Sequence, residues 1–381
     1  MTIKKTNLNR LRNVLVCLGI IFSFQLLPFG GAERAMGAEP YKIGNTFPFS
    51  GSLGGWGPLF SAAFQIAVDE QNSKGGIKGR EVKVVLEDSK GTPEGGVAAL
   101  RKLAEFDKVP VALSMMTNVV LAQLPYCDSK GVVLMTTVQS PGMAQRSRWH
   151  FVASVQVEPE IRALSAGAKG MGAKRLLSFE ADNAWGRSVV DVYKKIWVDE
   201  GGGAYENVYF KYGEIDYRGL LPRVREFNPD VLTECGQGAS EGGLIIKQTR
   251  EAGIRTPFFV SSTEVVPFVK RAFIGVEEGI VFTDTPRGGK DYDLLCQEFK
   301  KRTGEDCWIH IPIVYTQAKM IMQAFERAGD SAEAVRAYLA SLKNFPIPGG
   351  GSLSFDENKL AQPTNLTLYQ FKGGKVVPYT Q

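Results

Sequence analysis

Short apolar runs alternate with longer helical segments along most of this chain, and no other feature limits the fold as strongly. The expected strands are Tyr41–Phe47, Val82–Asp88, Val109–Ser114 and Val132–Thr137, and the expected helices between them are Pro58–Ser73, Pro93–Phe106 and Asn118–Ser129. The strand cores are continuous apolar runs, which is typical of parallel strands covered on both faces. Repeated units of this kind predict a doubly wound α/β sheet.

The alternation restarts near residue 159 and predicts a second sheet, because one open sheet with so many strands would be unusually large. The expected helices there are Pro159–Met171, Gly186–Glu200, Tyr217–Phe227, Ser240–Ala252 and Glu264–Phe273, and the expected strands are Arg175–Ala181, Asn207–Tyr212, Asp230–Gly236 and Pro257–Ser262. Extended segments at His150–Glu158 and near Phe282–Pro286 are the expected boundaries. Further helices are expected at Tyr292–Lys301, Ile313–Ala328 and Ala332–Leu342, before a tail of short strands.

The first 38 residues have the composition of a secretory signal peptide. Basic residues precede the apolar run Val14–Leu27, and small residues follow at Ala35, Gly37 and Ala38. A membrane anchor is the alternative, but the run is short for a membrane span. We therefore expect export with cleavage just before Glu39.

Charge gives no support for a nucleic-acid partner. The formal net charge of +5 falls to about +1 once residues 1–38 are removed, because that segment holds five basic residues and one acid. The sequence shows no basic stripe interleaved with aromatic residues.

Four cysteines remain after that cleavage, and export permits disulfides. Cys296 and Cys307 flank the end of an expected helix and can form a bridge, although free buried cysteines are also common. With His150 and His310 as the only histidines, the chain has little material for a histidine metal site or a serine–histidine triad. No Walker loop or GxSxG elbow appears, so we predict neither a cofactor nor an enzyme.

Loops at the carboxyl ends of the strands are the expected binding site, as in other open α/β sheets. The first such loop is rich in glycine and contains Trp56, a flat apolar wall. Thr117 and Asn118 follow the third strand and can either cap the next helix or hold an anion at its free amides. After the fourth strand, the Val138 carbonyl, Gln139 and Ser140 offer polar groups.

The second half of the chain offers three more loop positions. Trp185 follows Arg175–Ala181 and is expected to be partly exposed, unless it packs under its own helix. Gln237 lies in a glycine-rich turn without dinucleotide-binding spacing. Glu264 can favour a helix N-terminus or meet an ammonium group. Aromatic walls, hydroxyls and helix ends bind small molecules without transforming them.

The expected mature chain opens with four recognisable stretches, and four later landmarks follow them. The opening stretches are Tyr41-Lys42-Ile43-Gly44, Pro48-Phe49-Ser50-Gly51, Trp56-Gly57 and Ala67–Asp88, and the later landmarks are Asp182–Gly186, Pro229-Asp230-Val231, Ala252-Gly253-Ile254 and Gly351–Asp356. Together they resemble the branched-chain amino-acid/amide type of periplasmic solute-binding protein. The resemblance spans the whole mature chain.

This resemblance implies two doubly wound α/β lobes joined by a three-segment hinge. It places residues 39–153 and 284–345 in lobe I, and residues 154–283 and 346–381 in lobe II. It also implies a monomeric periplasmic protein that delivers a small-molecule ligand to the permease subunits of an ABC importer.

In amino-acid binders of this family, hydroxyl and backbone groups after the third and fourth strands hold the α-carboxylate and the ammonium group of the ligand. The matching positions in this sequence are Thr117, Asn118, Val138 and Ser140. The ammonium-binding acid falls on Ser262, Thr263 or Glu264. The chain departs from the family's serine-rich loop at Met115-Met116, and its two tryptophans are larger than a small aliphatic ligand needs. An amino acid, an aromatic carboxylate and an amide therefore all stay open, as does a ligand-sensing role.

Overall fold

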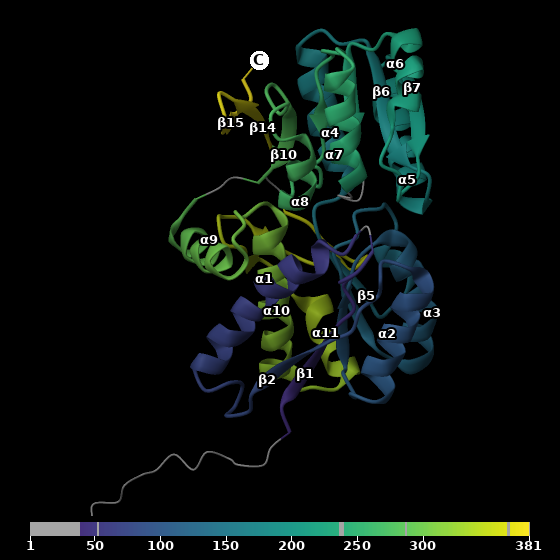
Figure 1. Ribbon diagram of the computed structural model, residues 1–381. Coiled ribbons are helices and arrows are strands. Elements are labelled where there is room, and N and C mark those ends of the chain that lie inside the picture. Colours follow the sequence, from purple (N-terminus) through teal and green to yellow (C-terminus); the bar gives the residue numbers. More distant parts are fainter. Residues whose placement is uncertain (1–38, 52, 236–239, 286–287, 364–365, 381) are drawn as a thin grey trace, which may run out of the picture. The chain divides into compact units, whose positions relative to one another are not determined.

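Two groups of strands organise the part of the chain that the computed structural model describes, residues 39–380 without 52, 236–239, 286–287 and 364–365 (Figure 1). The first sheet has the order β13-β5-β4-β3-β1-β2, and its strands pair in parallel. Its strands are β1 (Tyr41–Asn45), β2 (Val82–Leu86), β3 (Val111–Ser114), β4 (Val133–Thr136), β5 (His150–Ala153) and β13 (Leu360–Ala361).

Helices cover both faces of this sheet (Figure 1). On one side α2 (Pro93–Glu105) packs against α3 (Thr117–Lys130), and on the other α1 (Trp56–Ser73) packs against α10 (His310–Ala328), with α9 (Lys290–Thr303) and α11 (Ala332–Ser341) beside them. Every residue of β3 and β4 is buried, which confirms the expectation of strands covered on both faces for the middle of the sheet, whereas the residues of the edge strand β2 are mostly only partly buried or exposed.

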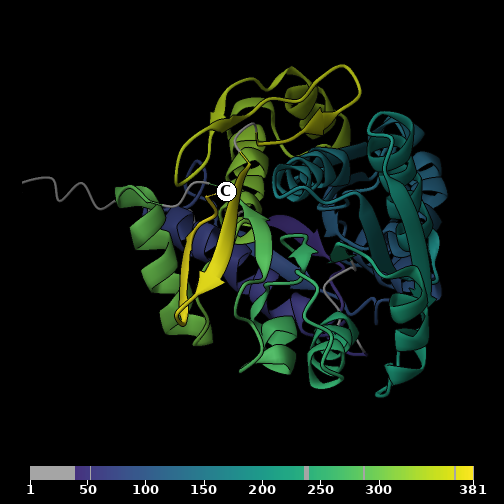
Figure 2. The same cartoon turned by 90° about the horizontal axis from the view of Figure 1, so that it is seen from above.

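The second group begins with the parallel order β7-β6-β8 and continues through β9, β10, β14 and β15. A parallel bridge between Leu232 and Phe258 links its two parts. Its strands are β6 (Arg175–Ala181), β7 (Ala204–Phe210), β8 (Val231–Glu234), β9 (Phe259–Val260), β10 (Val281–Asp284), β14 (Thr367–Lys372) and β15 (Lys375–Pro378). Figure 2 shows the yellow β14–β15 hairpin beside the green β10, and β14 pairs with β10 in the antiparallel sense.

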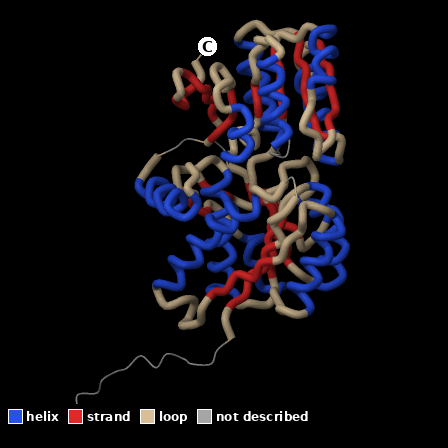
Figure 3. The backbone as a smooth tube through the Cα atoms, in the orientation of Figure 1, coloured by secondary structure: helices blue, strands red, loops and turns tan. Residues whose placement is uncertain are grey.

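Helices also flank the second group, as Figure 3 shows in blue beside the red strands. They are α4 (Val157–Gly170), α5 (Ala184–Tyr193) with the π-helical turn η2 (Lys194–Asp199), α6 (Leu221–Phe227), α7 (Ser240–Glu251) and the short α8 (Pro267–Lys270). Short 3₁₀ turns lie at η1 (Ala144–Arg146), η3 (Arg218–Leu220) and η4 (Arg271–Phe273). The two lobes are therefore α/β bodies, lobe I on the first sheet and lobe II on the second group.

The chain passes between the lobes after Ala153, after Asp284 and after Ala361, where β5, β10 and β13 end. The third passage differs from the expected boundary at residue 345. Strand β13 pairs with β5 of lobe I, and the hairpin of β11 (Phe345–Pro346) and β12 (Ser352–Leu353) precedes it. Residues 346–361 were expected in lobe II, but backbone hydrogen bonds to the free edge of β5 hold their last part on lobe I.

Some expected elements begin or end elsewhere. Helix α1 starts at Trp56 rather than at Pro58, and Glu264–Phe273 contains only α8 and η4 instead of one helix. Among the described residues no helix is long and apolar enough to cross a membrane. The expected signal peptide, residues 1–38, lies outside the described residues.

A disulfide joins Cys296 of α9 to Cys307, just before α10, with a Cα–Cα distance of 5.4 Å. Cys127 and Cys235 are free and buried. The bridge that the sequence left open is therefore confirmed, and it ties the start of α10 to α9.

Replacing Cys296 and Cys307 together by serine should lower the free energy of unfolding by about 2–4 kcal/mol, because the open chain gains conformational freedom when unfolded. Urea unfolding monitored by circular dichroism measures the change. The wild-type protein treated with dithiothreitol is the matched control and should behave like the double variant. An unchanged unfolding midpoint in both would show that the bridge contributes nothing to stability.

Candidate functional site

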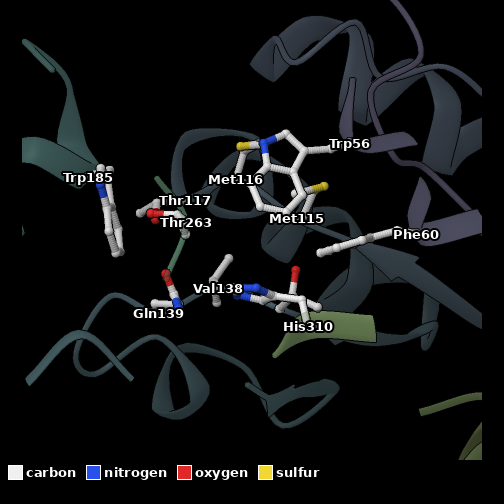
Figure 4. Close-up of a pocket in the computed structure, with 11 residues that line it drawn as sticks. Trp56, Phe60, Met115, Met116, Thr117, Val138, Gln139, Trp185, Thr263 and His310 are labelled. Atoms are coloured by element: carbon white, nitrogen blue, oxygen red, sulfur yellow. The ribbon is translucent and has the colours of Figure 1, made fainter. Parts of the chain in front are cut away.

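A pocket lies where loops of both lobes meet, and it spans about 360 Å³ of space that is partly open to solvent (Figure 4). Most of its loops leave the carboxyl ends of strands, as expected for an open α/β sheet. Its walls are formed by Trp56, Phe60, Met115, Met116, Thr117, Thr137, Val138, Gln139, Trp185, Thr263 and His310. Five of the sequence-predicted residues are in this set: Trp56, Thr117, Val138, Gln139 and Trp185.

Trp56 forms the aromatic wall of lobe I. It is the first residue of α1, and its ring packs edge-on against Phe60 one turn later, with 4.9 Å between ring centroids. Phe268 of α8 meets the same ring from lobe II at 5.4 Å. A side chain at Gly57 would come within 2.2 Å of the Pro48 carbonyl oxygen, so glycine is needed there to hold the tryptophan against its loop.

Thr117 does not cap α3, which corrects one of the two interpretations from the sequence. The helix begins at Thr117 itself, and the preceding Met116 has a left-handed φ of 68° with no side-chain cap. The Thr117 hydroxyl instead lies 2.8 Å from the Ser140 hydroxyl, which in turn lies 3.2 Å from the hydroxyl of Ser188 on α5. The first amides of a helix have no carbonyl partner inside it, so this end of α3 offers donors beside the hydroxyls.

Asn118 is half-buried, outside the set of residues that line the pocket. Its Oδ1 atom is buried and meets no hydrogen-bond donor among the described residues. Ser140 is buried behind Thr117 rather than on the wall. The structure therefore gathers these two residues next to the pocket without placing either on its surface.

Residues 138–140 form the junction between the pocket and the first passage to lobe II. The Val138 carbonyl, expected to serve a ligand, accepts a hydrogen bond from Gln156 Nε2 at 3.2 Å. Gln139 lines the pocket, and its Nε2 atom lies 3.4 Å from the carboxyl of Glu160 on α4. The same carboxyl accepts from the Ser262 amide at 3.1 Å and from the Thr283 hydroxyl at 2.5 Å.

Trp185 faces the pocket from lobe II and is only 3% exposed, so the expectation of a partly exposed ring is wrong. Asn183 caps α5 by accepting from the Gly186 amide at 3.0 Å. The indole Nε1 of Trp185 donates to the Cys235 carbonyl at 2.6 Å, and the ring packs in the core of lobe II. The ring is thus both a core residue and a fixed wall.

Thr263 rather than Glu264 lines the pocket in the loop after β9. Glu264 is fully buried behind it, and its Oε1 atom lies 3.3 Å from the Thr263 hydroxyl. Gln237, the remaining predicted residue, lies outside the described residues.

Lobe II buries several carboxyl groups close to this loop. Glu160, Glu180, Glu234 and Glu264 are all completely buried. A Cβ atom at Gly242 would lie 2.3 Å from Glu264 Oε2 and 2.7 Å from Glu234 Oε2, so the two carboxyls flank one glycine. Burial raises the pKa of Glu160, and it raises the pKa of Glu180 well above its ordinary range, with Glu264 adding to the effect.

Sequence reasoning missed Phe60, Met115, Met116, Thr137 and His310 as pocket walls. Phe60 follows Trp56 at helical spacing, and the methionines directly follow β3, so those positions carried a usable signal. His310 is the first residue of α10, which lies far along the chain from the other wall residues, and no local sequence pattern marks it as a pocket residue. Burial lowers its pKa to about 3, so the imidazole is neutral at pH 7.

The described lining residues include no Lys, Arg, Asp or Glu. Aromatic rings and methionines supply flat apolar surface, while threonine hydroxyls, an amide and an imidazole supply directed hydrogen bonds. Such a lining suits reversible binding of a small, flat or branched molecule.

Comparison with known proteins agrees with this architecture. The family profile described as "Periplasmic binding protein" matches residues 40–375. The Leu/Ile/Val-binding protein BraC3 of Rhizobium johnstonii is 25% identical over 353 residues, which cover 88% of this chain and 92% of that relative.

Solved structures share the fold across almost the whole chain. A leucine-binding protein LivK from Thermotoga maritima gives a TM-score of 0.80 at 22% identity, covering 89% of this chain and 97% of its own. An ABC transporter solute-binding protein from R. palustris, solved in complex with benzoate, gives a TM-score of 0.80 at 17% identity and covers 89% of this chain and 95% of its own.

The buried carboxyl of Glu180 makes stability depend on pH. Its pKa is higher in the folded chain than the ordinary value of 4.5, so the folded state holds a proton that the unfolded state releases. Stability should therefore fall as the pH rises above about 4.5 towards the folded pKa. Glu180→Gln keeps the size and shape of the side chain but removes the titrating group. The melting temperature of the variant should therefore fall less between pH 5 and pH 8 than that of the wild type.

Differential scanning fluorimetry across that pH range measures the effect. Glu357→Gln, a change at an exposed carboxyl, is the control and should follow the wild type. Parallel pH profiles for the Glu180 variant and the wild type would contradict the assignment of a buried, protonated Glu180.

Proposed function

Because the chain belongs to the periplasmic binding protein family, we propose that it captures a small organic carboxylate between its lobes and delivers it to an ABC importer. The observation that carries this proposal is a single pocket with one tryptophan wall from each lobe, Trp56 and Trp185. A molecule bound there touches both lobes, so it favours the conformation in which they approach each other.

The carboxylate is held at the start of α3. The hydroxyls of Thr117 and Ser140 lie 2.8 Å apart, next to the first-turn amides of the helix. Hydroxyls and helix amides bind anions without a cationic side chain, and the positive end of the helix dipole adds to the attraction. Gln139 and Thr137 add polar groups on the pocket wall beside Thr117, while Asn118 and Ser140 support this group from behind the surface.

The class of carboxylate has two candidates. The similarity to Leu/Ile/Val-binding proteins supports an amino acid, whose ammonium group would face Thr263 and the Glu264 carboxyl behind it. The benzoate-bound neighbour, together with the two indole rings, supports an aromatic carboxylate, and an amide is a related alternative. The Glu264 carboxyl distinguishes the two classes of ligand, because it can pair with the ammonium group of an amino acid but has no such partner on an aromatic carboxylate.

Binding without turnover is the activity that this lining supports. A sensing role that reports ligand to a receptor or regulator is the second candidate, because fold alone does not fix the partner. Permease genes next to this one would favour import.

We further propose that the protein is exported, loses residues 1–38 and acts in the periplasm as a monomer. The basic, apolar and small-residue regions of that segment support cleavage. Mass spectrometry of the exported protein would test it, and a mature chain that still begins at Met1 would contradict it.

A melting-temperature screen of leucine, isoleucine, valine, benzoate and benzamide tests the proposal. A ligand present at about 100 times its dissociation constant should stabilise the folded state by about 2.7 kcal/mol, which is visible as a raised melting temperature. No shift with amino acids, aromatic acids or amides would contradict capture of these solutes.

The single variants Trp56→Ala and Trp185→Ala should each bind the solute found in that screen about 1–3 kcal/mol more weakly. Each variant loses an aromatic wall and the apolar area that the wall buries against the solute. Isothermal titration calorimetry measures the dissociation constants. Trp197→Ala is the matched control, since that indole is buried in lobe II but does not line the pocket. Unchanged affinity in both pocket variants would place the binding site elsewhere.

A further inference from the structure

His310 is a pocket residue with an unused hydrogen-bonding position on its ring. It is the first residue of α10 and only 2% exposed. Its Nδ1 atom is buried and meets no hydrogen-bond partner among the described residues. A buried ring nitrogen normally has a partner, so an unmet one beside a cavity marks a place for another molecule.

Aromatic neighbours hold the imidazole in one orientation. Its ring packs against Trp56 at 5.7 Å, with an angle of 79° between the planes, and against Phe60 at 5.9 Å and 31°. Figure 4 shows the ring nitrogens directed towards Val138 and the interior of the pocket. The disulfide at Cys307 restrains the backbone of the loop that leads into α10, and the aromatic contacts restrain the ring itself.

His310 lies apart from the polar group that we assign to the carboxylate. In Figure 4, Thr117, Thr263 and Gln139 gather on the side of Trp185, whereas His310 lies on the side of Phe60. A carboxylate bound at Thr117 therefore directs the rest of the ligand towards the imidazole, across the surface formed by Trp56, Met115 and Met116.

We propose that His310 is a specificity-determining residue that hydrogen-bonds a polar group at the end of the ligand remote from its carboxylate, and that the ligand is a flat carboxylate bearing a hydroxyl there. This inference rests on the proposed function and deepens it. A hydroxyl both donates and accepts, so it satisfies the neutral imidazole in either tautomer. The side chains of leucine, isoleucine and valine end in methyl groups and leave the ring nitrogen unpaired.

Calorimetric titration of the full chain at pH 7 with 4-hydroxybenzoate, benzoate and leucine tests the proposal. The wild type should bind 4-hydroxybenzoate about tenfold more tightly than benzoate, since the hydroxyl supplies one buried hydrogen bond. His310→Phe keeps the aromatic packing and should remove the difference between the two aromatic acids. His310→Asn keeps a donor and an acceptor and should retain part of it.

Phe60→Leu is the matched control, since it removes apolar wall area and should weaken both aromatic acids equally. Equal wild-type affinity for the two aromatic acids, tighter binding of leucine, or an unchanged preference in His310→Phe would each overturn the role of His310 and leave solute capture standing. Absence of binding by all three probes would overturn the proposed capture of carboxylates and this inference with it.

Discussion

Parallel strand pairing is the constraint on which the rest of this structure depends. In a parallel sheet every strand ends at the same edge, so the loops after β1, β3 and β4 meet beside one another in lobe I. The loops after β6 and β9 do the same in lobe II. Both edges border the same pocket, so one side chain from each loop is enough to surround a small molecule. Trp56, Thr117 and Trp185 are three such side chains.

The junction between the lobes is the second constraint, and Glu160 is its centre. Its buried carboxyl accepts hydrogen bonds from the Ser262 amide and the Thr283 hydroxyl of lobe II. Gln139, on the pocket wall of lobe I, is the third partner. Loss of a buried hydrogen-bonding group leaves its partners unsatisfied, which costs about 1–3 kcal/mol for each group. Of the three bonds only the one from Gln139 crosses between the lobes, so a change in their relative position must keep or exchange that bond, which links the pocket wall to the hinge.

Local sequence patterns were sufficient for most parallel strands and for five pocket residues, whereas β5 and β10 were expected only as extended boundary segments. Strand β6 was expected at its observed bounds, because a short apolar run between two helical segments indicates a buried strand. The restarted alternation predicted the second sheet and the family resemblance supplied the lobe boundaries, but these put Leu360–Ala361 in lobe II, because β13 is too short to show a strand pattern. Thr117 was ambiguous because a hydroxyl at a helix start fits a cap as well as a site. His310 was missed because its place in the pocket depends on packing between α10 and α1, which are distant in sequence.

The central claim is that a solute binds between the tryptophans of the two lobes. A crystal structure of the protein with its solute bound tests this most directly. The account predicts one molecule in contact with both Trp56 and Trp185, its carboxylate at the start of α3. A molecule seated instead in the hollow lined by Lys270, Phe282 and Phe371, with the pocket at Trp56 unchanged, would contradict it.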